Sequence, residues 1–143
     1  MAPINNTSEL EALLDAWSDP ASQTKTTFLE LKKHLASKPE VELDFVARPG
    51  VTYSLRAKHV RQNKRPLFAM VDIIDDDPDD RWLSVCFFGE MITDPDEIGD
   101  FVPEGLMGED AHCFDIEERN ERLNQYVTMR LDEAYGSAAA GEA

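Results

Sequence analysis

The chain has 143 residues, of which 42% are hydrophobic and 30% are charged, and its net charge is −15 at pH 7. These are values of a globular protein, so we expect a single domain over residues 1–143 with flexible ends at 1–7 and 137–143. The negative charge argues against nucleic acids and anionic membrane surfaces as partners, because their phosphates would be repelled.

The sequence predicts a cytoplasmic protein. No run of residues is apolar enough to span a bilayer, and the first six residues lack the basic and apolar parts of a signal peptide. Because the cytoplasm is reducing, we expect Cys86 and Cys113 to be free thiols.

Two helices are predicted at the start of the chain. Ser8 and Glu11 match a capping box, and apolar residues then recur at helical spacing as far as Trp17. A second apolar stripe at helical spacing covers residues 28–35, and Lys38-Pro39 stops it.

Four segments then have the pattern of strands. Residues 41–45 and 51–58 alternate between apolar and polar, and Pro49 and Gly50 between them fit a type II turn, so we expect a hairpin. Residues 67–74 and 82–91 are apolar runs on either side of an acidic turn and predict two central antiparallel strands. Since both faces of these runs are apolar, we expect cover on both sides of the sheet, from helices, from a long loop or from a second copy.

Residues 93–110 are rich in turn formers and predict a long loop, followed by a short strand over residues 112–116. Asp115 and Glu118 resemble a helix start, so we expect a last amphipathic helix to begin there and to end at Gly136. The predicted fold class is α+β, with N-terminal helices, an antiparallel meander sheet of about five strands and a C-terminal helix.

The acidic turn at residues 75–80 is a weak candidate for divalent metal. Asp75, Asp77 and Asp79 are spaced like the first three ligands of a calcium-binding EF-hand loop. Asp80 stands where that loop needs glycine, and Cys86 stands where it needs a bidentate glutamate. A solvated turn is therefore the expected structure, with weak Mg²⁺ or Ca²⁺ binding as the alternative.

His112 and Cys113 are residue types that bind transition metals, but no second Cys or His pair stands at zinc spacing. Alternation along a strand also sends these two side chains to opposite faces. A catalytic pair of Cys86 or Cys113 with His59 or His112 has no support in the sequence beyond the presence of these residues. We expect no metal and no cofactor.

Basic residues are concentrated around the second strand of the predicted hairpin. The cluster consists of Arg48, Arg56, Lys58, His59, Arg61, Lys64 and Arg65. One interpretation is that these bases pair with acidic residues across strands. The other is a binding site for a small anion or an acidic partner segment, with contacts from Thr52, Ser54, Arg56 and Lys58 on one face of the strand.

Several segments resemble an uncharacterised family of small bacterial α+β domains, a domain of unknown function. The likeness is carried by residues 48–56, 68–89, 105–110 and 113–115, and it covers the chain from about residue 35 to residue 134. The resemblance implies no activity and no catalytic residues.

Three hypotheses follow from these patterns. The first is a non-catalytic cytoplasmic module that binds a small ligand or a protein partner and forms a homodimer. The second is a small enzyme with a site between residues 93–112 and the sheet, for which the candidate residues are Tyr53, Arg56, Glu109, Asp110 and His112. The third is metal binding at the turn of residues 75–80.

Overall fold

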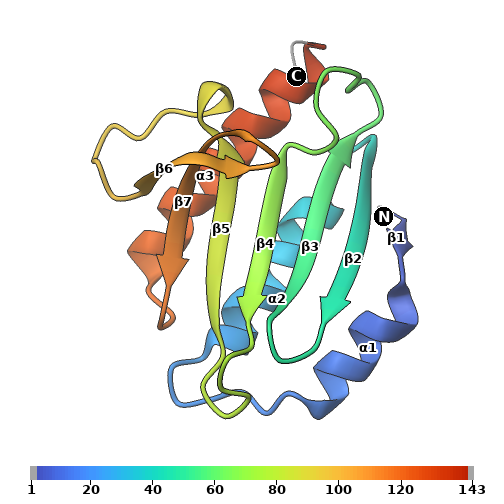
Figure 1. Ribbon diagram of the computed structural model, residues 1–143, viewed down its shortest axis with the longest axis vertical. Coiled ribbons are helices and arrows are strands. Elements are labelled where there is room, and N and C mark those ends of the chain that lie inside the picture. The colour runs from blue at the N-terminus through green and yellow to red at the C-terminus, as the bar shows by residue number, and fades with distance from the viewer. Residues whose placement is uncertain (1–2, 142–143) are drawn as a thin grey trace.

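The computed structural model describes residues 3–141 and contains one mixed seven-stranded sheet with three helices (Figure 1). The strands are β1 (Ile4–Asn5), β2 (Val41–Arg48), β3 (Thr52–His59), β4 (Ala69–Ile74), β5 (Trp82–Phe88), β6 (Asp100–Leu106) and β7 (Glu109–Ile116). The helices are α1 (Thr7–Ala16), α2 (Thr24–Ala36) and α3 (Glu121–Ala139), and a 3-10 turn, η1, spans Gly89–Met91. The α+β class is confirmed, and no helix between residues 3 and 141 is both long and apolar enough to cross a membrane.

Both predicted strand pairs form. β2 pairs antiparallel with β3, and the turn between them closes with the N–H of Val51 donating to the carbonyl of Arg48 at 2.9 Å. Gly50 has a φ of +80°, which a type II turn requires at that place and which glycine adopts without strain. β4 pairs antiparallel with β5 on either side of the acidic turn.

The prediction of a meander of about five antiparallel strands is wrong. The sheet has seven strands in the order β1-β2-β3-β4-β5-β7-β6, and β1 is parallel to β2. The segment predicted as a long loop contains β6, which forms a hairpin with β7. β7, and not β6, lies beside β5, so the last two strands depart from chain order.

Three predicted helix ends also differ from the structure. Helix α1 begins at Thr7, and its N-cap is Asn6 with no side-chain hydrogen bond, so the capping box at Ser8 does not form. Helix α3 begins after Asn120, whose Oδ1 accepts the N–H of Leu123 at 3.0 Å. It runs through Gly136 to Ala139, because packing of buried Ala134 and Ala138 favours the helix beyond the glycine.

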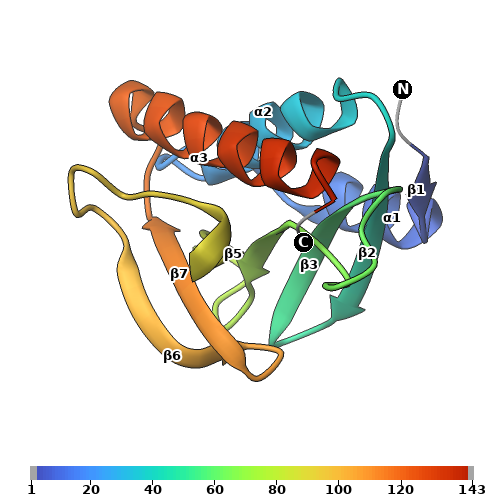
Figure 2. The same ribbon diagram turned by 90° about the horizontal axis from the view of Figure 1, so that it is seen from above.

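The helices form one layer on a single face of the sheet. Figure 2 shows α2 and α3 lying across this face, and α1 packs against β2 near the sheet edge. The core between the layers includes the fully buried rings of Phe28, Phe45, Phe87 and Phe114. We call the other side of the sheet the open face. No helix among residues 3–141 covers it, and β6 crosses in front of the upper end of β5 in the view of Figure 1.

Candidate functional site

The open face carries the predicted anion-binding residues of β3. Residues with even numbers in β3 share this face, and they are Thr52, Ser54, Arg56 and Lys58. The register places Glu42 of β2 opposite Lys58 and Asp44 opposite Arg56.

Three cations on this face are not neutralised by direct contact. Arg48, Arg56 and Lys58 form no ion pair with any residue from 3 to 141, although carboxylates stand opposite two of them in the register. The Nε of Arg56 instead donates to Oγ of Ser54 at 3.2 Å. Positive charge is therefore available for a ligand on β3, on a chain whose net charge is strongly negative.

Asp72 of β4 lies in the middle of the open face, between Ser54 of β3 and Ser84 of β5. Burial raises the pKa of the Asp72 carboxyl, and the neighbouring Ser54, Arg56 and Arg48 oppose this rise. Its Oδ1 is buried and has no hydrogen-bond partner among the described residues. A buried acceptor without a donor costs free energy, so this oxygen is a place where a ligand could add a hydrogen bond.

A small cavity lies at one end of β3. Its volume is about 260 Å³, and Arg56 and Lys58 line it together with Asn5, Asp44 and Met107. Met107 comes from the turn between β6 and β7, so this hairpin forms one wall.

A second cavity, of about 510 Å³, lies where the β6–β7 hairpin meets η1. Arg65, Glu90, Glu109, Asp110 and His112 are among its lining residues. Three of the five residues proposed for an enzyme, Glu109, Asp110 and His112, therefore come together here. The other two do not join them, since Arg56 lines the first cavity and Tyr53 lines a third, between α1 and the sheet.

Arg65 is already engaged in this second cavity. Its Nη2 lies 2.9 Å from Oε1 of Glu109 and 2.9 Å from Oε2 of Glu90, and its guanidinium lies over the ring of Phe88. The hydrogen bond from Arg65 lowers the pKa of Glu109, and the same bond raises the pKa of Arg65. The guanidinium therefore organises the wall of the cavity and is not a free anion site.

A histidine–aspartate pair lies beside the same cavity. Nε2 of His112 is 2.7 Å from Oδ2 of Asp94, and the hydroxyl of Tyr126 in α3 donates to the other oxygen of Asp94. The N–H groups of Ile98 and Gly99 also donate to this carboxylate. Burial alone would raise the pKa of Asp94, but the hydrogen bonds from Tyr126, His112 and the two N–H groups lower it to about 2.

The sequence did not reveal this network. In the sequence, Asp94 is one of several acidic residues in the predicted loop of residues 93–110, and Tyr126 lies within the predicted C-terminal helix. The two side chains are 32 residues apart, and only the packing of residues 93–99 against α3 brings them together.

The acidic turn does not favour the metal hypothesis. Asp75 is buried, its Oδ1 lies 2.6 Å from Nε of Arg81, and its Oδ2 accepts the N–H of Gly50 at 2.8 Å. Asp77 accepts the N–H of Asp79 at 3.0 Å, as in a solvated turn. Within residues 3–141 no group of three or more His, Cys, Asp or Glu side chains is arranged to hold a metal ion.

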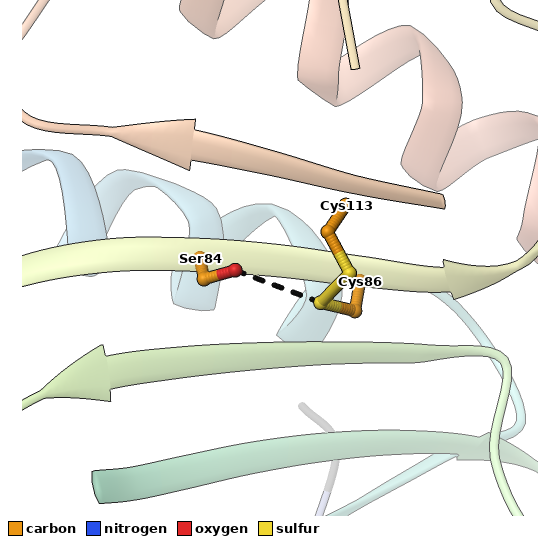
Figure 3. Close-up of a disulfide and its surroundings, with 3 residues drawn as sticks. All are labelled: Ser84, Cys86 and Cys113. Atoms are coloured by element: carbon orange, nitrogen blue, oxygen red, sulfur yellow. Dashed lines mark hydrogen bonds between the residues drawn. A yellow bond between two sulfur atoms is a disulfide. The ribbon is translucent and has the colours of Figure 1, made fainter. Parts of the chain in front are cut away.

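Cys86 and Cys113 form a disulfide, so the prediction of free thiols is wrong (Figure 3). Because β7 lies beside β5, the register sets Cys113 directly opposite Cys86, with their Cα atoms 4.1 Å apart. With both sulfurs in the disulfide, neither cysteine offers a thiol for a pair with His59 or His112. Their pairing could not be read from the sequence because it depends on β6 lying outside β7.

Comparison of the chain with protein families, with curated proteins and with solved structures gives no match.

Proposed function

We propose that the chain is a non-catalytic binding module that self-associates through the open face of its sheet. The observation that carries this proposal is the absence of a helix from this face among residues 3–141, in a sheet whose other face is covered. Met70, Ile74 and Trp82 lie on the open face and are only half-buried. A second sheet stacked on this face would remove their remaining apolar surface from water.

Basic residues of β3 and acidic residues of β6 and β7 lie on different parts of the open face, an arrangement that suits a symmetric dimer. Arg56 and Lys58 stand on β3, whereas Asp115 on β7 and Asp100 on β6 stand on the opposite side of the same face. An isologous dimer with its two-fold axis between β4 and β5, parallel to the strands, would place β3 of one copy over β7 of the other.

Sedimentation velocity tests this proposal. We expect a dimer whose dissociation constant rises at about 0.5 M salt, because the attraction between exposed charges is screened. The double substitution Arg56→Glu and Lys58→Glu should weaken the dimer by about tenfold or more. Arg122→Glu changes the charge in the same sense on an exposed position of α3, away from the open face, and serves as the control.

Two results would overturn the proposal: a chain that stays monomeric at every concentration, or a dimer that the open-face variant and the α3 variant weaken equally. Thermal melting of each variant shows whether it is folded before the comparison is made.

A second candidate function is an enzyme that uses the cavity of about 510 Å³. The pairing of His112 with Asp94 favours it, because a carboxylate fixes the orientation of an imidazole that acts as a base. A thermal-shift screen of small molecules against the native chain and against Asp110→Asn tests it. A compound that stabilises only the native chain would support the enzyme hypothesis. If no compound in the screen stabilises the native chain, this hypothesis is rejected.

We retain a cytoplasmic location as part of the proposal. A persistent disulfide is rare in that compartment, where disulfides are mostly transient and take part in redox chemistry. Cell fractionation followed by alkylation of free thiols would give both the location of the chain and the state of Cys86 and Cys113.

A further inference from the structure

The two sulfurs of the Cys86–Cys113 disulfide differ in their surroundings. Cys86 is buried, with 8% of its surface exposed, whereas Cys113 is partly exposed on the open face. Of the two cysteines, Cys113 is therefore the more accessible to a thiol that approaches from solvent.

Ser84 adds a second difference between the sulfurs. Its Oγ lies 3.6 Å from Sγ of Cys86, and Ser84 stands two residues before Cys86 on the same face of β5 (Figure 3). A hydroxyl at this position donates to a thiolate on Cys86 and lowers the free energy of that leaving group. No comparable donor to Cys113 is found among residues 3–141.

We propose that the Cys86–Cys113 disulfide is a thiol-exchange site, at which a small thiol binds covalently to Cys113 and thereby controls self-association. The thiolate of the small molecule attacks Sγ of Cys113, a new S–S bond forms, and the bond to Cys86 breaks. The electron pair of the broken bond stays on Cys86, which leaves as a thiolate next to Ser84. A second thiol then attacks the mixed disulfide, which releases the oxidised small molecule and leaves both cysteines reduced.

The charge around Cys113 selects the class of thiol. Asp100 stands opposite Cys113 on β6, and Asp115 lies two residues further along the same face of β7. These carboxylates repel an anionic thiol and attract a cationic one. We therefore expect an aminothiol such as cysteamine to react faster than a thiol that carries a carboxylate.

The fold does not depend on this bond alone. β5 and β7 are paired at six register positions from Leu83 to Phe88, so the strands remain adjacent after the disulfide opens. An adduct on Cys113 would stand on the open face and obstruct a second sheet, and this part of the inference depends on the proposed self-association.

The exchange is tested on the oxidised full chain at a concentration at which it is monomeric. The chain is treated with cysteamine or with 3-mercaptopropionate, quenched with acid, blocked with N-ethylmaleimide and mapped by mass spectrometry. We expect the cysteamine adduct on Cys113 and the maleimide on Cys86, with faster reaction for cysteamine. An adduct found on Cys86, or a disulfide that reacts with neither thiol in the folded chain, would overturn the exchange site.

Two variants test the roles of the neighbouring residues. Ser84→Ala should slow the exchange by roughly threefold or more, because the leaving thiolate loses its donor, whereas Ser137→Ala in α3 should have no effect. Asp100→Asn should reduce the preference for cysteamine over 3-mercaptopropionate. Equal rates in the native chain and in Ser84→Ala would contradict the role of Ser84 as the donor.

Sedimentation of the purified adduct then separates the two proposals. A dimer in the untreated chain and a monomer in the adduct supports control of self-association by the thiol. If the adduct forms but the dimer persists, the regulatory part is wrong. If the untreated chain is monomeric, the proposed function fails, and the exchange site is still judged by its own mapping experiment.

Discussion

Asp75 and Arg81 form a buried ion pair across the acidic turn, with Oδ1 of Asp75 at 2.6 Å from Nε of Arg81. Cζ of Arg81 also lies 5.9 Å from the ring centroid of Trp17 and 5.8 Å from that of Tyr53, and the hydroxyl of Thr24 donates to the carbonyl of Arg81 at 2.7 Å. The pair therefore connects the turn between the two central strands to the N-terminal helices. The role of the pair is structural, which explains why Asp75 is buried whereas the other aspartates of the turn are exposed.

Arg81→Met should lower the free energy of unfolding by roughly 3 kcal/mol or more, because it leaves a buried carboxylate without its cation. Urea unfolding measures this change. Asp76→Ala removes an exposed charge from the same turn and should change the stability by less than about 0.5 kcal/mol. Equal losses in the two variants would show that the buried pair has no special role.

Asp94→Asn should make the stability less dependent on pH in the acid range. Because the pKa of Asp94 in the folded chain is about 2, below its value of 3.8 in an unfolded chain, its ionised form stabilises the fold. This stabilisation, roughly 2 kcal/mol, is fully present above about pH 5 and is lost as the pH falls toward 2. The native chain and the variant should therefore differ at pH 7 and converge near pH 2, as urea unfolding at several pH values would show.

Asp96→Asn is the control for this experiment, because its side chain is exposed in the same segment and makes no hydrogen bond in the described part of the chain. A gap between the native chain and Asp94→Asn that does not shrink with falling pH would contradict the role of the Asp94 carboxylate.

Asp72→Asn should raise the stability of the chain at pH 7, whereas Asp94→Asn should lower it. Burial raises the pKa of Asp72, so the folded chain disfavours the ionised form, and the stability falls as the pH rises through the unfolded value toward the folded one. At pH 7 the variant should be more stable than the native chain, and near pH 3 the two should be alike. The measurement is made on the monomer, with Asp115→Asn as an exposed control on the same face, and a less stable Asp72→Asn at pH 7 would refute the prediction.

Alanine substitutions at two glycines should also act in opposite directions. A Cβ on Gly99 would lie 2.7 Å from Cδ2 of His112 and 2.8 Å from Cε2 of Phe114, so Gly99→Ala must displace the histidine or its neighbour and destabilise the chain. A Cβ on Gly136 in α3 would meet no atom within 4 Å, so Gly136→Ala should stabilise by about 0.5–1 kcal/mol. Thermal unfolding of both variants tests the packing around Asp94 and His112.

The local pattern of the sequence was enough for much of the fold. Alternation and the Pro49-Gly50 turn gave the β2–β3 hairpin, because a half-buried strand repeats every two residues and a type II turn needs glycine at its third position. The apolar runs before and after residues 75–80 gave the pairing of β4 with β5. Helical spacing of apolar residues located all three helices but misplaced their ends, since caps and final turns depend on neighbouring elements.

The part around β6 and β7 was decided by the tertiary structure. Only Leu106 of β6 is buried, so the strand has no alternating pattern to reveal it, and it exists because β7 offers it backbone partners. Because β7, and not β6, lies beside β5, Cys113 lies opposite Cys86 and His112 lies within hydrogen-bond distance of Asp94.

The α+β class, the central strand pairs and the residues that share the face of β3 could thus be predicted from the local pattern, because they depend on contacts between near neighbours in the chain. The disulfide, the Asp94–His112–Tyr126 network and the gathering of the helices on one face were decided only in three dimensions. Each of them joins residues that are distant in sequence, and a local pattern carries no information about which distant segments become neighbours.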